Sequence, residues 1–177
     1  MFSKLRYYID FDTLKTVYYA LVESHLQYCN LSWGNAGKNI LKPLQTLQNR
    51  IIRIMTFAPF SCRNVSKLYD DIEILNLDQL HHLLKGKFMY KHKHEKLPKN
   101  FESYFQIAND SGNYNLRSSS NSNYKCIWGK TTKSTKRLQY NAVKTWNAIP
   151  LEIRNLGTLS NFSAVYKLHL INQISAH

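Results

Sequence analysis

The sequence predicts a mainly α-helical protein. Apolar residues recur three and four positions apart along several stretches, residues that favour helix caps precede these stretches, and prolines follow several of them. The apolar fraction of 44% and the aromatic fraction of 13% are sufficient for a packed core. We therefore expect a bundle of helices, then a basic irregular linker with a weak β-hairpin, and helices again at the C-terminus.

The first helix is predicted from Thr13 to Tyr28. Asp12 precedes it and is a typical N-cap residue. Its apolar residues have helical spacing and are Leu14, Val17, Tyr18, Leu21 and Val22. The next segment, Cys29 to Gly37, is rich in Asn, Ser and Gly, so it is predicted to be a turn.

The second predicted helix follows the sequence Trp33-Gly34-Asn35-Ala36 and is the most informative part of the chain. Between Leu41 and Met55 one apolar stripe contains Leu44, Leu47, Ile51, Ile54 and Met55. The cations of this helix fall largely outside the stripe and include Lys42, Arg50 and Arg53. Such a helix packs with its apolar side and shows its cations to solvent or to a phosphate backbone. We expect it to end near Phe57, before Pro59.

Two further helices are predicted before Pro98. A short helix from Val65 to Tyr69 is capped by Asn64 or Ser66. A long helix begins with Asp78 as its cap, and Pro98 marks its end. The inner face of this long helix is predicted to contain Leu80, Leu83, Leu84 and Phe88.

The C-terminal half of the chain changes in composition. Residues 106–124 are mostly Asn, Ser and Gly and predict a loop or linker, and residues 124–140 predict a weak hairpin. A helix over residues 141–149 should end at Pro150, and Thr158 or Ser160 should cap a last helix. The inner face of the last helix is predicted to contain Phe162, Val165, Leu168 and Ile171. The sequence therefore predicts that the whole chain has three regions: a helical region over 1–98, a basic linker or hairpin over 99–140, and a C-terminal helical segment over 141–177.

The charge of the chain favours an anionic partner. The net charge is +13, and residues 85–137 hold twelve basic and three acidic side chains. No segment approaches the roughly 18 apolar residues of a membrane span. No predicted helix has the wide Trp/Phe/Leu face with an all-basic opposite side that is typical of a membrane-surface helix. Nucleic acid is therefore the expected partner, with no membrane. Three widely separated cysteines suit a reducing compartment, which predicts an intracellular protein in the nucleus or the cytoplasm.

We predict no catalytic residue, no metal site and no cofactor. Tyr69-Asp70-Asp71 is close to the polymerase signature whose paired carboxylates hold Mg²⁺, but Leu68 stands where an aromatic residue belongs and the flanking sequence predicts a helix end. The clustered histidines lack the spacing of metal ligands, so we expect them on a solvated helix face; they are His81, His82, His92 and His94. The chain contains no Walker loop, dinucleotide fingerprint or serine-hydrolase motif.

For nucleic-acid binding we predict contacts from cations and one aromatic residue. The second and third long helices contribute Lys42, Arg50, Arg53, Lys85, Lys87, Lys91 and Lys93. The basic extension contributes Arg117, Lys125, Trp128, Lys130, Lys133, Lys136 and Arg137. Aromatic residues between cations stack on unpaired bases, and for Trp128 base stacking and core packing are equally favoured. Trp33 and Trp146 are expected to fill the core.

Several short segments of the chain also occur in the order found in a known family. They are Leu14 to Val22, Tyr28 to Ala36, Leu44 to Arg53, Lys87 to Lys91, Leu97-Pro98, Tyr114 to Arg117, Trp146 to Pro150, and Glu152-Ile153-Arg154. In this order they resemble the C-terminal third of the polymerase protein of non-LTR (LINE-type, jockey-like) retrotransposons. The resemblance covers nearly the whole chain. Leu116 departs from the Tyr-Asn-Thr-Arg pattern of the family, and the glycines often found before Trp146 are missing.

The resemblance implies a reverse-transcriptase fragment: a thumb-like helical region followed by the basic extension, without the palm and the endonuclease. The thumb is expected to grip a primer–template duplex through its backbone. We therefore expect a non-catalytic segment that binds the phosphates of RNA or of an RNA–DNA hybrid, with the missing palm as a second partner. The alternatives are a structural or protein-interaction module, or a decayed fragment with no independent activity.

Overall fold

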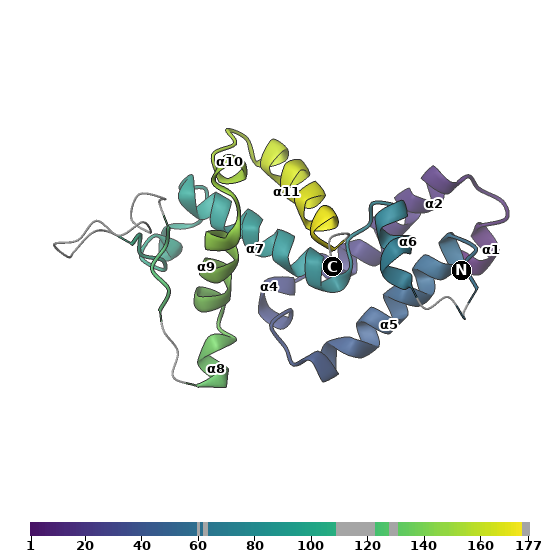
Figure 1. Ribbon diagram of the computed structural model, residues 1–177, viewed down its shortest axis with the longest axis horizontal. Coiled ribbons are helices and arrows are strands. Elements are labelled where there is room, and N and C mark those ends of the chain that lie inside the picture. Colours follow the sequence, from purple (N-terminus) through teal and green to yellow (C-terminus); the bar gives the residue numbers. More distant parts are fainter. Residues whose placement is uncertain (60, 62–63, 109–122, 128–130, 175–177) are drawn as a thin grey trace. The chain divides into compact units, whose positions relative to one another are not determined.

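The computed structural model describes residues 1–59, 61, 64–108, 123–127 and 131–174 and confirms the mainly α-helical fold (Figure 1). Within these ranges, extended pairing consists of one antiparallel bridge between Ile107 and Tyr124. The predicted hairpin over residues 124–140 is wrong in its described part, because α8 (Thr132–Thr135) and the first residues of α9 (Leu138–Ala148) are helical. A capping box at Thr131 and Ser134 starts α8 and explains the helix at this position.

The chain divides into two compact units. The N-terminal unit contains residues 1–81 and the end of the chain from Leu168, and the central unit contains His82–Lys167. Two helices, α7 (Leu77–Lys93) and α11 (Leu159–Ile174), contribute residues to both units. The other helices of the N-terminal unit are α1 (Phe2–Leu5), α2 (Phe11–Tyr18), the π-helical turn η1 (Tyr19–Glu23), α3 (Ser24–Gln27), α4 (Asn30–Trp33), α5 (Lys38–Met55) and α6 (Val65–Asp71).

The first predicted helix is present as α2, η1 and α3 in succession, but its cap is Asp10. The Asp10 carboxylate accepts hydrogen bonds from the backbone N–H of Thr13 at 3.0 Å and from its hydroxyl at 2.7 Å. Both bonds stabilise the charged carboxylate and lower the pKa of Asp10. The prediction of Asp12 as the cap is wrong because helical geometry begins two residues earlier than the apolar pattern suggests, at Phe11.

The π-helical turn η1 changes which side of this first helix is buried. Leu14 and Tyr18 lie before it and are buried, and Val22 within it packs against the same core. Leu21 is 46% exposed, although α-helical spacing predicts it on the inner side. A π turn adds one residue to a turn, and the added residue rotates the following side chains away from their α-helical positions.

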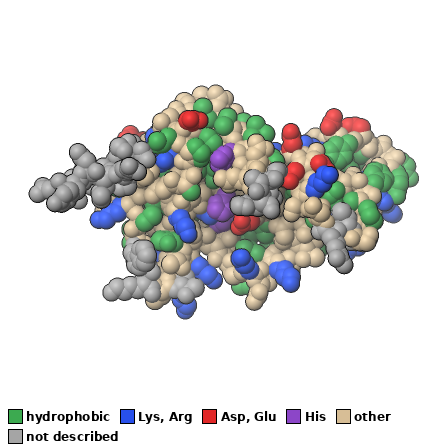
Figure 2. Space-filling view, in the orientation of Figure 1, with side chains coloured by type: hydrophobic (Ala, Val, Ile, Leu, Met, Phe, Trp, Pro, Cys, Tyr) green, Lys and Arg blue, Asp and Glu red, His purple; other side chains and the backbone are tan. Residues whose placement is uncertain are grey.

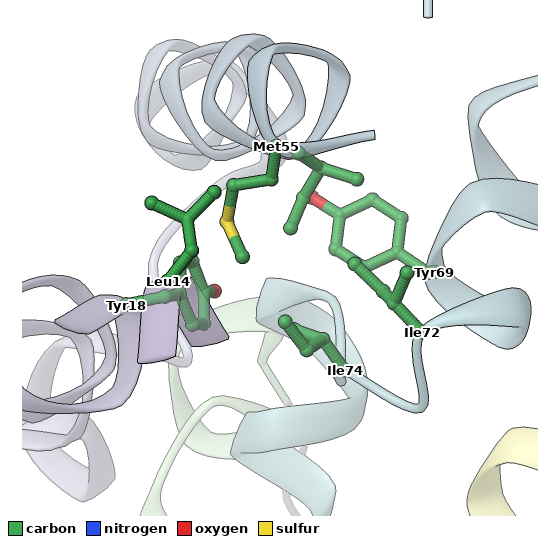
Figure 3. Close-up of a cluster of buried hydrophobic side chains, with 7 residues drawn as sticks. Leu14, Tyr18, Met55, Tyr69, Ile72 and Ile74 are labelled. Carbon is green, nitrogen blue, oxygen red and sulfur yellow. The ribbon is translucent and has the colours of Figure 1, made fainter. Parts of the chain in front are cut away.

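The core of the N-terminal unit forms where α2, α5 and α6 meet. Figure 3 shows Leu14 and Tyr18 of α2, Met55 of α5 and Tyr69 of α6 pointing toward one another. Ile52 of α5 and two residues from the segment after α6 complete the cluster; the two are Ile72 and Ile74. α1 and α6 both pack against α5, which is therefore the central helix of this unit (Figure 1).

The buried side of α5 differs from the predicted apolar stripe. Leu44 is 36% exposed and Leu47 is 56% exposed, so the predicted stripe is wrong at its first two positions. Gln48 is buried instead, at 2% exposure. Its amide donates to the hydroxyl of Tyr18 at 2.8 Å and to the carbonyl of Leu75 at 2.9 Å. A buried amide with both bonds made avoids the cost of desolvation, so a polar residue can occupy a core position.

The capping predictions for α6 and α11 are confirmed, and the one for α7 is wrong. The side chain of Asn64 accepts from the N–H of Lys67 at the start of α6, and the Thr158 hydroxyl accepts from Asn161 at the start of α11. At α7 the cap is Asn76: its side chain accepts from the N–H of Gln79, whose side chain accepts in return from the N–H of Asn76, both at 2.9 Å. This reciprocal pair takes the place predicted for Asp78.

The central unit is organised around an aromatic core. Its further elements are the 3₁₀ turn η2 (Lys99–Phe101) and the helices α8, α9 and α10 (Leu151–Arg154). The ring of Phe162 stacks on Tyr90 with 4.7 Å between centroids and lies beside Trp146 and Tyr166. The core position predicted for Trp146 is confirmed. On α11, Val165 and Leu168 are exposed, so only part of its predicted inner face is correct.

Candidate nucleic-acid interface

The predicted contacts on α7 do not form an exposed row of lysines. Lys85 is 4% exposed because it lies four residues from His81 and four from Met89, both buried on the same side of the helix. Lys93 donates to the carbonyl of Arg154 at 3.1 Å and to the side chain of Asn155 at 3.0 Å, and burial lowers its pKa. Lys87 and Lys91 are half-buried. The prediction of Lys85 as a surface contact is therefore wrong. The ammonium group of Lys93 is hydrogen-bonded to residues of its own unit.

The cations of α5 are mostly accessible. Lys42 and Arg50 are exposed, Arg53 is half-buried, and the helix contains no acidic residue. Lys38, which was not among the predicted contacts, is also exposed and lies one turn before Lys42. Figure 2 shows Lys and Arg side chains along the lower edge of the molecule where α5 begins.

A second group of exposed cations lies on α8, α9 and the residues that join them. We call it the α8–α9 basic face; its members are Lys133, Lys136, Arg137 and Lys144. Residues 131–151 contain no acidic side chain. None of the four cations has a side-chain hydrogen bond or ion pair with any residue that the structure describes. These four charges are therefore available to a partner.

The orientation of this face follows from the packing of α9. Ala142, Val143 and Trp146 are buried, which turns Lys144 to the opposite side of the helix. Arg137, at the N-cap, lies seven residues before Lys144, so both lie along one side of α9. Lys144 is an exposed cation of this segment that the sequence interpretation did not name. The apolar residues Ala142, Val143 and Trp146 define the inner side of the predicted helix, and helical spacing from them places Lys144 on the outer side; this pattern could have identified Lys144.

The remaining predicted contacts are scattered or lie outside the described part of the chain. Lys125 is exposed and belongs to the segment that pairs with residues 106–108. Arg117, Trp128 and Lys130 lie outside the described residues. Three of the predicted contacts, Lys133, Lys136 and Arg137, are therefore exposed within one short segment, and Lys144 is a fourth exposed cation on the following helix.

The N-terminal unit contains a pocket next to the basic residues of α5. We call it the α4–α5–α7 pocket; its cavity volume is about 360 Å³. The residues that line it are Asn30, Trp33, Gly34, Lys38, Leu41, Lys42, Gln45, Leu77, Asp78 and His81. Its size falls at the lower end of the usual range for small-molecule sites.

One wall of this pocket is a hydrogen-bonded network around His81. The ring nitrogen Nδ1 is 2.6 Å from the amide oxygen of Asn30, and Nε2 is 2.9 Å from the amide oxygen of Asn35. The side-chain amide nitrogen of Asn30 donates to the carbonyl of Leu26 at 2.9 Å, which directs the amide oxygen of Asn30 toward His81 and makes Nδ1 of His81 the donor. The Gly34-Asn35 part of the predicted turn thus serves to hold a buried histidine.

The environment predicted for the histidines is wrong at two positions. His81 is 5% exposed. His92 is half-buried, with Nε2 3.1 Å from the carbonyl of Phe101 and Nδ1 3.1 Å from the hydroxyl of Tyr124. Both rings have polar partners within their own unit. Among the described residues no group of three or more His, Cys, Asp or Glu side chains is placed to hold a metal ion.

The Tyr69-Asp70-Asp71 segment lies where it was predicted, and Trp33 does not. Tyr69-Asp70-Asp71 lies at the end of α6, as its helix-end interpretation predicts, and the Tyr69 hydroxyl donates to Asn49 at 2.9 Å. Trp33 is only half-buried, so its predicted core position is wrong, and its indole N–H donates to the carbonyl of Tyr28 at 2.8 Å.

Comparison with known proteins gives no relative for this chain. It matches no family model, no curated protein and no solved structure. No helix in the described part of the chain is long and apolar enough to cross a membrane.

Proposed function

We propose that this chain binds nucleic acid through the phosphate backbone, with the α8–α9 basic face as its main contact. The observation that carries the proposal is this face, because it has four exposed cations and no acidic residue over 131–151. Nucleic-acid phosphates attract such a surface and release bound counterions on contact. Cations that contact phosphates do not distinguish bases, so we expect little sequence preference.

The distribution of charge between the two units supports the same surface. The central unit holds fifteen basic and four acidic side chains, whereas the N-terminal unit holds nine basic and seven acidic ones. The central unit therefore carries a net charge of +11 out of the total of +13. Since binding to phosphates follows local charge, the central unit should dominate affinity, and the exposed cations of α5 should add to it.

The partner that we propose is RNA or an RNA–DNA hybrid. Support for this choice comes from the resemblance of the segments named above to the thumb and the following extension of non-LTR reverse transcriptases. On this proposal the chain is a non-catalytic part of such a polymerase, and the palm is its natural neighbour. We expect no deoxynucleotide incorporation on primed RNA with Mg²⁺ present, and the appearance of product would overturn this part of the proposal.

A salt titration of two matched variants tests the α8–α9 basic face. The first variant replaces Lys133, Lys136, Arg137 and Lys144 with glutamine. The second removes the same number of exposed cations elsewhere, by glutamine at Lys4, Lys67, Lys96 and Lys99. Affinity for a short RNA–DNA hybrid is measured by fluorescence anisotropy over a series of salt concentrations.

The two variants should differ although their net charges are equal. The basic-face variant should lose affinity, and the slope of log affinity against log salt should fall by about 0.9 or less for each lost phosphate contact. The control variant should retain most of the wild-type slope. Equal losses in the two variants would show that net charge alone drives binding. A wild-type interaction that does not respond to salt would favour the protein-interaction alternative instead.

A further inference from the structure

The polar wall of the α4–α5–α7 pocket is fixed by bonds within the protein. His81 and Asn30 are tied to each other, as described above. The amide of Gln45 donates to Asn49 at 2.8 Å and to Tyr69 at 3.0 Å, and its oxygen accepts from the N–H of Leu77 at 3.0 Å. Groups held in this way keep their positions when a ligand enters, so the pocket is preformed.

The chemistry left for a ligand is apolar surface with two cations. Trp33, Leu41 and Leu77 supply the apolar lining, and the indole ring of Trp33 is held in place through its N–H. Lys38 and Lys42 also line the pocket, are exposed, and have no side-chain partner among the described residues. A ligand that fits this combination has a flat, weakly polar body and one anionic group.

The N-terminus of α5 adds to the attraction for an anion at the same place. The N-cap of α5 is Gly37, which has no side chain to accept from the first-turn N–H groups. The positive end of the helix dipole therefore reinforces the charges of Lys38 and Lys42. Asp78, which also lines the pocket, opposes additional negative charge there and favours a ligand with a single phosphate.

We propose that the α4–α5–α7 pocket binds one unpaired nucleotide. Its base would lie against Trp33, Leu41 and Leu77, and its phosphate would contact Lys38 and Lys42. Only an unpaired base can leave its stack and place its ring in a pocket, whereas a duplex offers its phosphates to a surface. The inference rests on the proposed nucleic-acid function and adds to it a contact for a single-stranded end or a displaced base.

Nuclear magnetic resonance with adenosine 5′-monophosphate tests the proposal on the full chain. Adenosine alone and inorganic phosphate alone are the comparison probes. The monophosphate should shift the indole signal of Trp33 and the backbone signals of Gly34 and Lys38, and it should bind more tightly than either comparison probe. The double variant Lys38→Gln/Lys42→Gln should weaken binding of the monophosphate roughly tenfold, because a hydrogen bond between charged groups typically changes affinity by about this factor. The matched control Lys4→Gln/Lys67→Gln removes two exposed cations of the same unit that do not line the pocket, and it should leave this binding unchanged.

Failure of this inference can be told apart from failure of the proposed function. Hybrid binding that depends on the α8–α9 basic face, without any shift of Trp33 by the monophosphate, overturns the pocket inference and leaves the proposed function standing. Shifts at Trp33 that survive the Lys38→Gln/Lys42→Gln change also overturn it, because the phosphate would then not be held by these lysines. Shifts at Trp33 that disappear in that variant support the pocket, even where the hybrid does not bind.

Discussion

Gly34 and His81 lie so close together that a side chain at position 34 would have to displace the His81 ring. A Cβ atom added to Gly34 would overlap Nδ1 of His81, and it would lie 2.7 Å from Cε1 of the same ring and 2.6 Å from the carbonyl oxygen of Asn30. The backbone of Gly34 is right-handed helical, with φ of −64°. The glycine is therefore required for space and not for its backbone freedom.

The change Gly34→Ala should destabilise the N-terminal unit. The added methyl group must displace a buried ring that is hydrogen-bonded to Asn30, so we expect a loss of about 1–3 kcal/mol, as in other overpacked sites. Gly157→Ala is the matched control, because a Cβ at Gly157 meets nothing within 4 Å. Thermal unfolding followed by circular dichroism measures both variants. Equal midpoints for the two variants would show that His81 can move away without cost.

The positions of the helices could be predicted from the sequence, because local signals determine them. Asn64 and Thr158 cap α6 and α11 as predicted, and Pro59 lies just beyond the end of α5. Each of these signals acts within a few residues of the helix end. The pattern of caps and apolar spacing therefore established the mainly α-helical fold.

Which side of a helix is buried was harder to predict, because distant contacts decide it. On α5 the apolar residues Leu44 and Leu47 are exposed while Gln48 is buried, since the partners of Gln48 come from α2 and from the segment after α6. Lys85 and His81 were expected at the surface for a similar reason: residue type suggested solvent, and tertiary packing placed them inside. The pocket beside α5 follows from the same long-range contacts.

The change Gln48→Leu should destabilise the protein although leucine is apolar and similar in size. It leaves the hydroxyl of Tyr18 and the carbonyl of Leu75 without the donor that each has now. An unsatisfied buried polar group typically costs 1–3 kcal/mol, so we expect a loss of about 2 kcal/mol. Urea unfolding measures it, with Gln27→Leu at an exposed position as the control. A stability equal to that of the wild type would mean that the two groups find other partners.

Buried tyrosines should make the protein sensitive to alkaline pH. Burial raises the pKa of Tyr18 and of Tyr69 well above the usual value near 10. In the unfolded chain these phenols ionise near pH 10, whereas in the folded protein they stay protonated. Their contribution to stability is therefore complete below about pH 10 and is lost as the pH rises toward the folded-state values.

The change Tyr69→Phe isolates one of these groups. The free energy of unfolding should fall above about pH 10, by up to roughly 1.4 kcal/mol per pH unit for each tyrosine that stays protonated in the folded state. Tyr69→Phe should reduce this slope by the contribution of one tyrosine. The variant also loses the bonds of the Tyr69 hydroxyl to Asn49 and Gln45, which lowers stability at every pH but does not affect the slope. Tyr8→Phe removes a phenol that is 85% exposed and should leave the slope unchanged. Urea unfolding at a series of alkaline pH values provides the slopes, and an unchanged slope in Tyr69→Phe would show that this hydroxyl ionises without unfolding the core around it.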